Sequence, residues 1–169
     1  MNVEVDGLTE DSLPIECNGL VVERGDFVLG PIDLTISTGA TILLGRNGAG
    51  KTTLLRSFMG LEALSGGEIL VDGISTRDRR LRRESMLRVG FAPQLAALPK
   101  SARVADTVAY AAWLKGVKRQ ESADRVRVAL ETLNIEQFAG RRVGGLSGGE
   151  RQRVSIAMAI VHEPQVLLL

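Results

Sequence analysis

The sequence predicts an α/β protein that carries an all-helical insertion, and three features indicate this fold. Short apolar runs typical of strands alternate with helical patterns up to about residue 95. The stretch at about 95–145 then shows helical patterns alone. A glycine-rich loop near residue 50 joins an apolar run to a helix, an order typical of α/β cores. We therefore expect residues 15–169 to form one domain, with a helical subdomain at about 95–145 and a flexible tail at 1–14.

The strands expected before the insertion are short and apolar. They lie at 15–22, 32–37, 41–44, 68–71 and 87–92. Arg24-Gly25-Asp26 forms a turn after the first of them, and Asp72-Gly73 closes the fourth. Together with the helices around them, these strands predict an α/β core.

Helices are predicted wherever apolar residues recur at spacings of three and four. The first follows the glycine-rich loop and ends at Gly60, and two more are expected at 101–116 and 122–133. The last begins at Ser147 and stops before Pro164. Residues 166–169 are apolar like a buried strand.

Composition narrows the possible environments of the protein. The 169 residues are 44% hydrophobic and 24% charged, with a net charge of +1, so charge alone makes no case for nucleic acid or anionic membrane. Cys17 is the only cysteine, which excludes an internal disulfide, and no apolar run approaches the roughly 20 residues that span a bilayer. We expect a cytoplasmic protein that reaches a membrane only through a partner, peripherally on its inner face.

Residues 45–52 match the phosphate-binding pattern GxxxxGK[ST] at every fixed position. Glycines allow backbone N–H groups to approach phosphate oxygens, and the following helix N-terminus adds partial positive charge. Lys51 is expected at the β- and γ-phosphates of ATP, and the Thr52 hydroxyl on Mg²⁺. The residues expected to bind nucleotide here are Gly45, Arg46, Asn47, Gly48, Ala49, Gly50, Lys51, Thr52 and Thr53.

A second motif, Leu-Ser-Gly-Gly-Glu, occupies residues 146–150. Ser147 and Glu150 are three residues apart and fit a helix capping box. The capping box does not explain Gly148 and Gly149, since glycine in a helix costs roughly 1 kcal/mol relative to alanine. A phosphate site at the helix start does explain them, because bare N–H groups there bind anions.

Together these motifs resemble those of the ABC ATPase family. Residues 45–53 resemble its Walker A motif, 146–150 its signature motif, and Gln94, after Gly-Phe-Ala-Pro, its Q-loop. The resemblance runs from about residue 15 to residue 169 and implies a P-loop NTPase (RecA-like) core with an antiparallel β subdomain and a helical insertion. It also implies ATP hydrolysis, with Lys51 and Gln94 in catalytic roles and Thr52 and Gln94 at Mg²⁺.

The resemblance further implies partners. Two ATPase domains would pair head to tail, so that Ser147, Gly148, Gly149 and Glu150 meet the nucleotide held by the other domain. Transmembrane permease subunits would dock on the helical part, and no nucleic acid is expected. The stretch 110–116 is similar to bacterial multidrug exporters, so the expected function is the motor subunit of an exporter-type ABC transporter.

Two departures from the family pattern matter. The apolar residues 166–169 resemble the Walker B strand, but the Asp and Glu that follow it in the family are not in this sequence. We therefore expect a truncated domain, with the C-terminal part of the core missing, that binds ATP weakly and hydrolyses it little. The family often stacks adenine on an aromatic residue before Walker A; here Arg24 fits that position best, and Phe27 is the alternative.

Two alternatives to a transporter subunit remain open. One is a soluble ABC ATPase of DNA maintenance, and the other is a nucleotide-binding remnant without turnover. The absence of heptads and of a cysteine pair between the two motifs argues against the DNA-maintenance class.

The surroundings of three further residues can also be predicted. Tyr110 and Trp113 are expected in the core, with a docking surface as the alternative. His162 is expected to be a solvated loop residue.

Overall fold

The computed structural model describes residues 15–78, 82–93 and 96–169. The chain separates into two compact units, Met1–Arg88 and Val89–Leu169. The first unit contains the glycine-rich loop, and the second contains the helical segment. Each unit has its own sheet.

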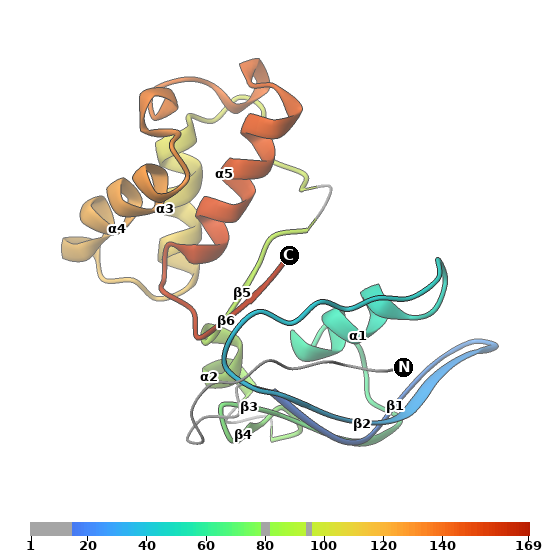
Figure 1. Ribbon diagram of the computed structural model, residues 1–169. Helices are drawn as coiled ribbons and strands as arrows, with labels where there is room; N and C mark the ends of the chain where they lie inside the picture. Colours follow the sequence, from blue (N-terminus) through green and yellow to red (C-terminus); the bar gives the residue numbers. More distant parts are fainter. Residues whose placement is uncertain (1–14, 79–81, 94–95) are drawn as a thin grey trace. The chain divides into compact units, whose positions relative to one another are not determined.

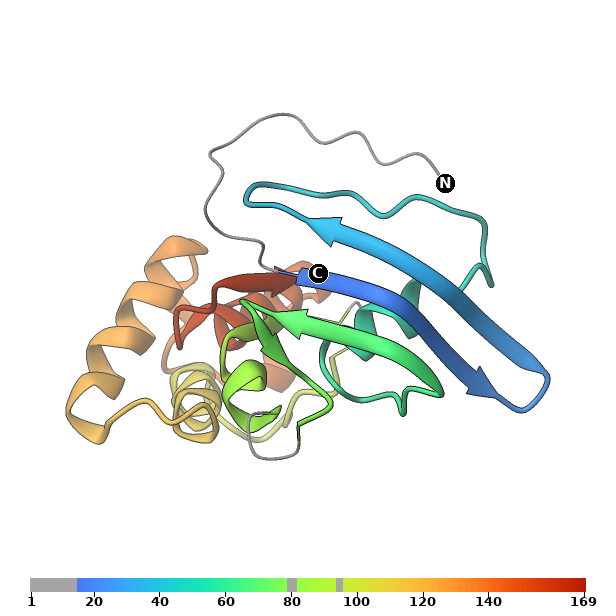
Figure 2. The same cartoon turned by 90° about the horizontal axis from the view of Figure 1, so that it is seen from below.

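The first unit is built on a four-stranded sheet in the order β2-β1-β3-β4. The bounds are β1 Ile15–Arg24, β2 Phe27–Ile36, β3 Gly66–Val71 and β4 Ile74–Ser75. Neighbouring strands are all antiparallel, and Figure 2 shows β2, β1 and β3 lying side by side in that order. The expected antiparallel β part is therefore confirmed, and β2 begins five residues earlier than the predicted strand at 32–37 because it continues the hairpin with β1.

Two helices belong to the same unit. Helix α1, Lys51–Phe58, buries Leu54 and Phe58, as its apolar spacing predicts. Helix α2, Arg82–Leu87, lies where no helix was predicted. Arg88, just after α2, forms ion pairs with Asp72 and Glu84, which tie α2 to the turn between β3 and β4.

The strand expected at 41–44 is not formed. These residues have no strand pairing among the described residues, and Ile42 and Leu44 are 77% and 73% exposed. A strand forms only when a neighbour takes its backbone hydrogen bonds, and the four-stranded sheet offers this segment no partner. The prediction from apolar character alone was therefore wrong for this structure.

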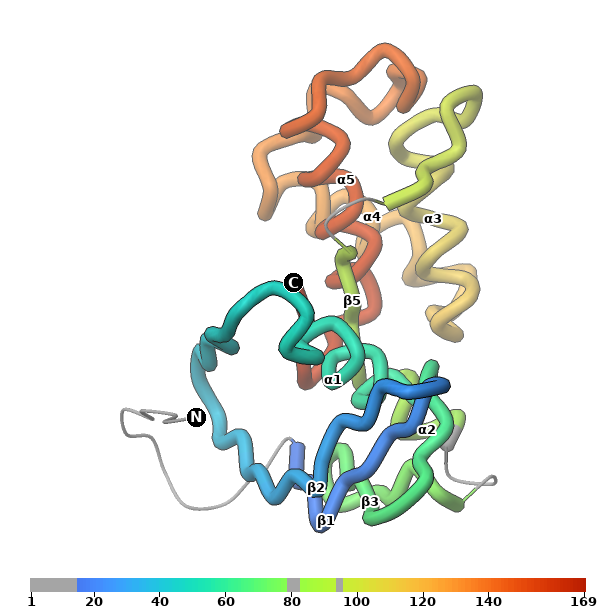
Figure 3. Tube along the Cα trace, turned by 90° about the vertical axis from the view of Figure 1, so that its right-hand side faces the viewer, coloured from blue at the N-terminus to red at the C-terminus, as the bar shows by residue number. Residues whose placement is uncertain are grey.

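The second unit contains a parallel pair of short strands and a helical bundle. The strands are β5 Val89–Phe91 and β6 Val166–Leu168. The helices are α3 Val104–Leu114, α4 Arg119–Thr132 and α5 Gly148–Ile160, with short 3₁₀ turns at Glu136–Phe138 and Val143–Gly145. Figures 1 and 3 show α3, α4 and α5 packed together, and all three were predicted within a few residues.

One hydrophobic cluster joins the three helices. Val108 of α3, Leu130 of α4 and Val154 of α5 are all buried in it. Helix α5 therefore shares the core of the helical segment, although it lies beyond the boundary near residue 145 that the sequence suggested. Helix α5 also packs against β5, where a Cβ on Gly90 would lie 2.2 Å from the carbonyl oxygen of Ala159.

The expectation that Tyr110 and Trp113 are core residues is wrong. Their rings stack on each other with centroids 5.8 Å apart, and the residues are 59% and 68% exposed. The buried face of α3 is set by Val104, Val108 and Ala112 at a spacing of four, which leaves both aromatic residues off that face. Within the described parts of the chain, no helix has the length and apolarity needed to cross a membrane.

Candidate nucleotide-binding site

The loop at 45–52 has a backbone that only glycine adopts readily. Gly48 and Gly50 have φ of 82° and 91°, in the left-handed region. The Ala49 N–H donates to the Arg46 carbonyl at 3.2 Å, which closes a tight turn, and the Leu54 N–H donates to Gly50 at 2.8 Å, which starts α1. The loop thus ends directly at a helix N-terminus, where N–H groups lack intrahelical partners and can bind an anion.

Lys51 folds back over this loop. Its Nζ donates to the carbonyl oxygens of Gly45 at 2.5 Å and Arg46 at 2.9 Å. The ammonium group is therefore placed at the mouth of the loop, and phosphate oxygens could replace the two carbonyl contacts. This arrangement fits the phosphate-binding role expected from the sequence.

Thr52 occupies the first turn of α1 and is exposed. A hydroxyl at this position fits Mg²⁺, which in nucleotide sites takes few protein ligands and completes its octahedron with water and phosphate oxygens. Thr52 would hold the ion, and the ion would neutralise charge on the phosphates. Gln94, the other expected metal ligand, lies outside the described residues.

The end of the β1–β2 hairpin lies beside the loop. A Cβ on Gly50 would be 2.7 Å from Leu29 Cδ1 and 3.3 Å from Phe27 Cζ, so both side chains contact the start of α1. Arg24 is directly opposite Phe27 in the register of the hairpin. Directly opposed residues present their side chains on the same face, so Arg24 and Phe27 both lie on the face that carries the phosphate loop.

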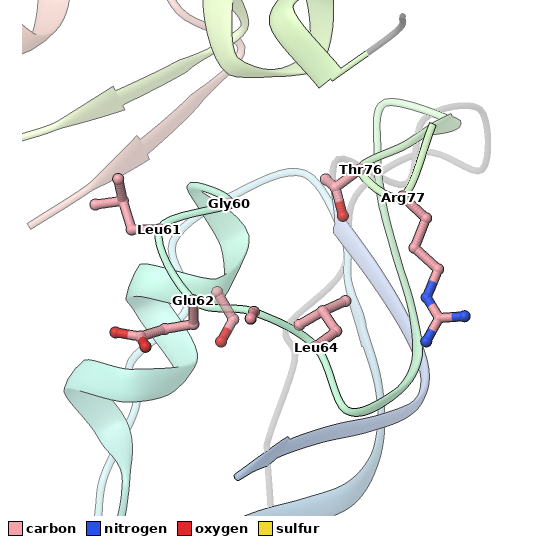
Figure 4. A pocket seen from close by; sticks show the side chains of 8 residues that line it. Gly60, Leu61, Glu62, Leu64, Thr76 and Arg77 are labelled. Atoms are coloured by element: carbon pink, nitrogen blue, oxygen red, sulfur yellow. The ribbon is translucent and has the colours of Figure 1, made fainter. Parts of the chain in front are cut away.

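Arg24 is part of a charge cluster that the sequence did not indicate. Glu62 accepts from Arg56 Nε of α1 at 2.5 Å and forms an ion pair with Arg24 Nε at 3.5 Å. The Glu62 side chain is only 6% exposed, while that of Arg24 is 56% exposed. Figure 4 shows Glu62 beside α1, at the edge of a cavity of about 270 Å³ lined also by Ser57, Gly60, Leu61, Ala63, Leu64, Thr76 and Arg77.

The second motif forms the N-terminus of α5 in the other unit. Ser147 Oγ accepts from the Glu150 N–H at 3.3 Å, and Glu150 Oε2 accepts from the Ser147 N–H at 2.6 Å, so the predicted capping box is confirmed. These bonds, from the Ser147 backbone first and its side chain second, lower the pKa of Glu150.

The glycines of this motif leave the helix start open. A Cβ on Gly148 or Gly149 would meet nothing within 4 Å, so packing does not require glycine at either position. Arg151 donates to the Leu146 carbonyl at 2.6 Å and Arg141 to the Gly145 carbonyl at 3.1 Å, which fixes the loop before the helix. The geometry therefore fits a phosphate group approaching the start of α5 from outside.

The expectation of a solvated His162 is wrong. Both ring nitrogens are buried without a hydrogen-bond partner among the described residues. Burial, and then the positive charge of Lys115, lower the pKa of His162 to about 4, and the Val89 carbonyl opposes this shift to a smaller extent. The Lys115 Nζ donates to that same carbonyl at 2.8 Å, so the cluster lies between β5 and the ends of α3 and α5.

Comparison with known proteins agrees with these motifs. The family model described as ABC transporter matches residues 29–169. A sulfate/thiosulfate import ATP-binding protein of Methylococcus capsulatus is 41% identical over 163 residues, which cover 93% of this chain and 46% of that protein. An sn-glycerol-3-phosphate import ATP-binding protein of Rhizobium johnstonii is 38% identical, over 92% of this chain and 42% of that protein.

The fold has solved counterparts. A component of the cbiONQ ABC transporter complex of Clostridium perfringens superposes with a TM-score of 0.72 at 27% identity, over 93% of this chain and 64% of that one. The chain thus spans a little under half the length of the curated relatives named above. The family model covers most of the chain, and the sequence motifs and the fold agree with it. This chain belongs to the ABC transporter family and has the P-loop NTPase fold of its ATP-binding subunits.

Proposed function

We propose that this chain is the ATP-binding part of a motor subunit that hydrolyses ATP to drive a transporter. The observation that carries the proposal is the Lys51 ammonium held over a loop with left-handed Gly48 and Gly50, at the start of α1. A glycine-rich loop, a helix N-terminus and the Lys51 ammonium are adjacent there, which are the groups that triphosphate binding requires. Thr52 would hold Mg²⁺ at the same phosphates.

The direction of transport that we propose is import. The two curated relatives described above are named as import proteins, and they give no support to the exporter expected from residues 110–116.

The proposed partners are a second ATPase domain and transmembrane permease subunits. The open start of α5, with Gly148 and Gly149 free of packing contacts, suits contact with a nucleotide held by the second domain. The exposed pair of Tyr110 and Trp113 is a candidate contact for a permease. The protein would then act at the inner face of the membrane.

Nucleotide binding can be tested by changing Lys51 alone. Lys51→Ala should weaken ATP binding at least about tenfold, because a charge-assisted contact is worth roughly 1.5–3 kcal/mol. Lys118→Ala, at an exposed lysine of the other unit, is the matched control and should bind like the wild type. Titration calorimetry with and without Mg²⁺ gives the affinities, and equal binding by both variants would refute the phosphate site.

The transporter role needs a separate experiment. Affinity purification of the protein from membranes solubilised in mild detergent should recover an integral membrane protein. Recovery of DNA in place of a membrane protein would favour a DNA-maintenance ATPase. Nucleotide binding in a protein that pairs with neither would indicate a remnant.

A further inference from the structure

We propose that Glu62 is a positioning residue for the nucleobase: it holds the Arg24 guanidinium so that the plane of this group can stack on the base. The proposal rests on the proposed nucleotide binding and extends it from the phosphates to the base. It involves three residues of the first unit, Arg24, Arg56 and Glu62, in which the Glu62 carboxylate pairs with both arginines.

The position of Arg24 relative to the phosphate loop follows from two contacts. Phe27 and Leu29 touch the start of α1 at Gly50, and Arg24 is directly opposite Phe27 on the same face of the hairpin. A nucleotide with its phosphates in the loop therefore has the end of this hairpin as its neighbour. Arg24, with a side chain 56% exposed, presents there the flat surface on which a base can stack.

An exposed arginine normally samples many rotamers, and ordering it on binding costs free energy. Glu62 reduces that cost because its carboxylate is nearly buried and is itself fixed from the other side by Arg56. The Glu62 carboxylate is thereby shared between α1 and the end of β1. The ion pair engages Arg24 at Nε, an in-plane donor, so this contact does not use the faces of the guanidinium group.

The sharing of Glu62 also links the two halves of the binding site. Arg56 is on the helix whose first turn holds Lys51 and Thr52, so the residue expected at the base and the residues at the phosphates are connected through one side chain. Among the described residues, Glu62 forms ion pairs with Arg24 and Arg56 and with neither Lys51 nor Thr52. A change at Glu62 should therefore affect the base-dependent part of the affinity much more than the affinity for phosphates.

The test compares ATP with inorganic tripolyphosphate, which carries the phosphates without a base. Glu62→Gln keeps the shape but removes the charge, and it should weaken ATP binding about three- to tenfold while tripolyphosphate binding changes less than about twofold. Glu84→Gln, which alters another arginine-paired carboxylate of the same unit, should change neither. Should Glu62→Gln fail to fold, Glu62→Asp keeps the charge on a shorter side chain and allows the same comparison.

A second experiment, made in the Arg24→Tyr variant, separates a positioning role of Glu62 from a role in the stability of the protein. In Arg24→Tyr the stacking surface no longer depends on an ion pair, so adding Glu62→Gln should leave ATP binding unchanged. Equal losses of ATP and tripolyphosphate binding in Glu62→Gln would overturn the proposal and leave a structural role for Glu62. Wild-type protein that binds neither ligand would refute the proposed function itself, and the positioning role would fall with it.

Discussion

At the scale of single residues, Gly90 shows how closely helix and strand approach in the second unit. A Cβ there would lie 2.2 Å from the Ala159 carbonyl oxygen and 2.9 Å from Pro164 Cγ. Gly90→Ala should therefore destabilise the protein by about 1–3 kcal/mol, toward the upper end because the obstacle is backbone. Urea unfolding measures the effect, and Gly140→Ala, where a Cβ meets nothing within 4 Å, is the matched control. Equal stability of the two variants would show that α5 moves away from β5 at little cost.

His162 makes a residue-scale prediction about pH. Burial and the charge of Lys115 lower its pKa from 6.5 to about 4, so the folded protein keeps it neutral while the unfolded chain protonates it. Between these values the unfolded state binds more protons, and stability must rise with pH. His162→Gln should flatten that slope, most clearly in the upper part of the window, where carboxylates contribute least. An unchanged slope in denaturant midpoints measured across pH would contradict a buried, neutral ring.

At the scale of elements, the start of α5 depends on the reciprocal bonds of Ser147 and Glu150. Their bonds lower the Glu150 pKa below its ordinary 4.5, so the carboxylate stabilises the folded state above that value and loses this effect as pH falls through its folded pKa. The stability gap between wild type and Glu150→Gln should thus be largest near neutral pH and shrink below pH 4.5. Thermal unfolding over that pH range measures the stability gap. A gap that widens in acid would exclude a stabilising role of the ionised Glu150 carboxylate.

The elements also show what the sequence can predict. The helices α3, α4 and α5 were predicted closely because their apolar residues recur every three to four positions, a local property. The motifs at 45–52 and 146–150 could be recognised for the same reason, since each is a contiguous pattern of residues. The strand at 41–44 was not formed, because a strand depends on a partner that local sequence cannot reveal.

The other side chains that were overlooked or wrongly predicted also depend on contacts that local sequence does not show. Glu62 gains its role from arginines 38 residues before it and 6 before it in the chain, and no short pattern joins the three. His162 is buried by packing around β5, whereas its neighbours Glu163 and Pro164 indicated a loop. Tyr110 and Trp113 looked like core residues by type, and only the helix register shows that they lie outside.

At the scale of the whole molecule, the two helix N-termini that are expected to bind phosphate, those of α1 and α5, belong to different compact units of one chain. The start of α1 carries a lysine and a hydroxyl, as a primary binding site does, whereas the start of α5 offers bare glycines. Such unequal sites fit the proposed pairing, in which the first site would bind ATP and the second would contact ATP held by another copy. The proposed head-to-tail pairing would bring one site of each kind, from two copies, to the same nucleotide.

This pairing can be tested without disturbing the first site. Gly149→Asp places a negative charge where the phosphate of the second copy is expected, so like charges should prevent ATP-dependent dimers. The same charge favours a helix N-terminus, which means that α5 itself should not be weakened. Gly140→Asp is the matched control, since a Cβ at either glycine meets nothing within 4 Å.

Light scattering with ATP and Mg²⁺ measures the mass of each variant. We expect a doubled mass for wild type and Gly140→Asp and a monomer for Gly149→Asp. The ATP affinity of the monomer should stay within about twofold in all three. Dimers of Gly149→Asp as stable as those of wild type would rule out contact between the start of α5 and the nucleotide of a partner.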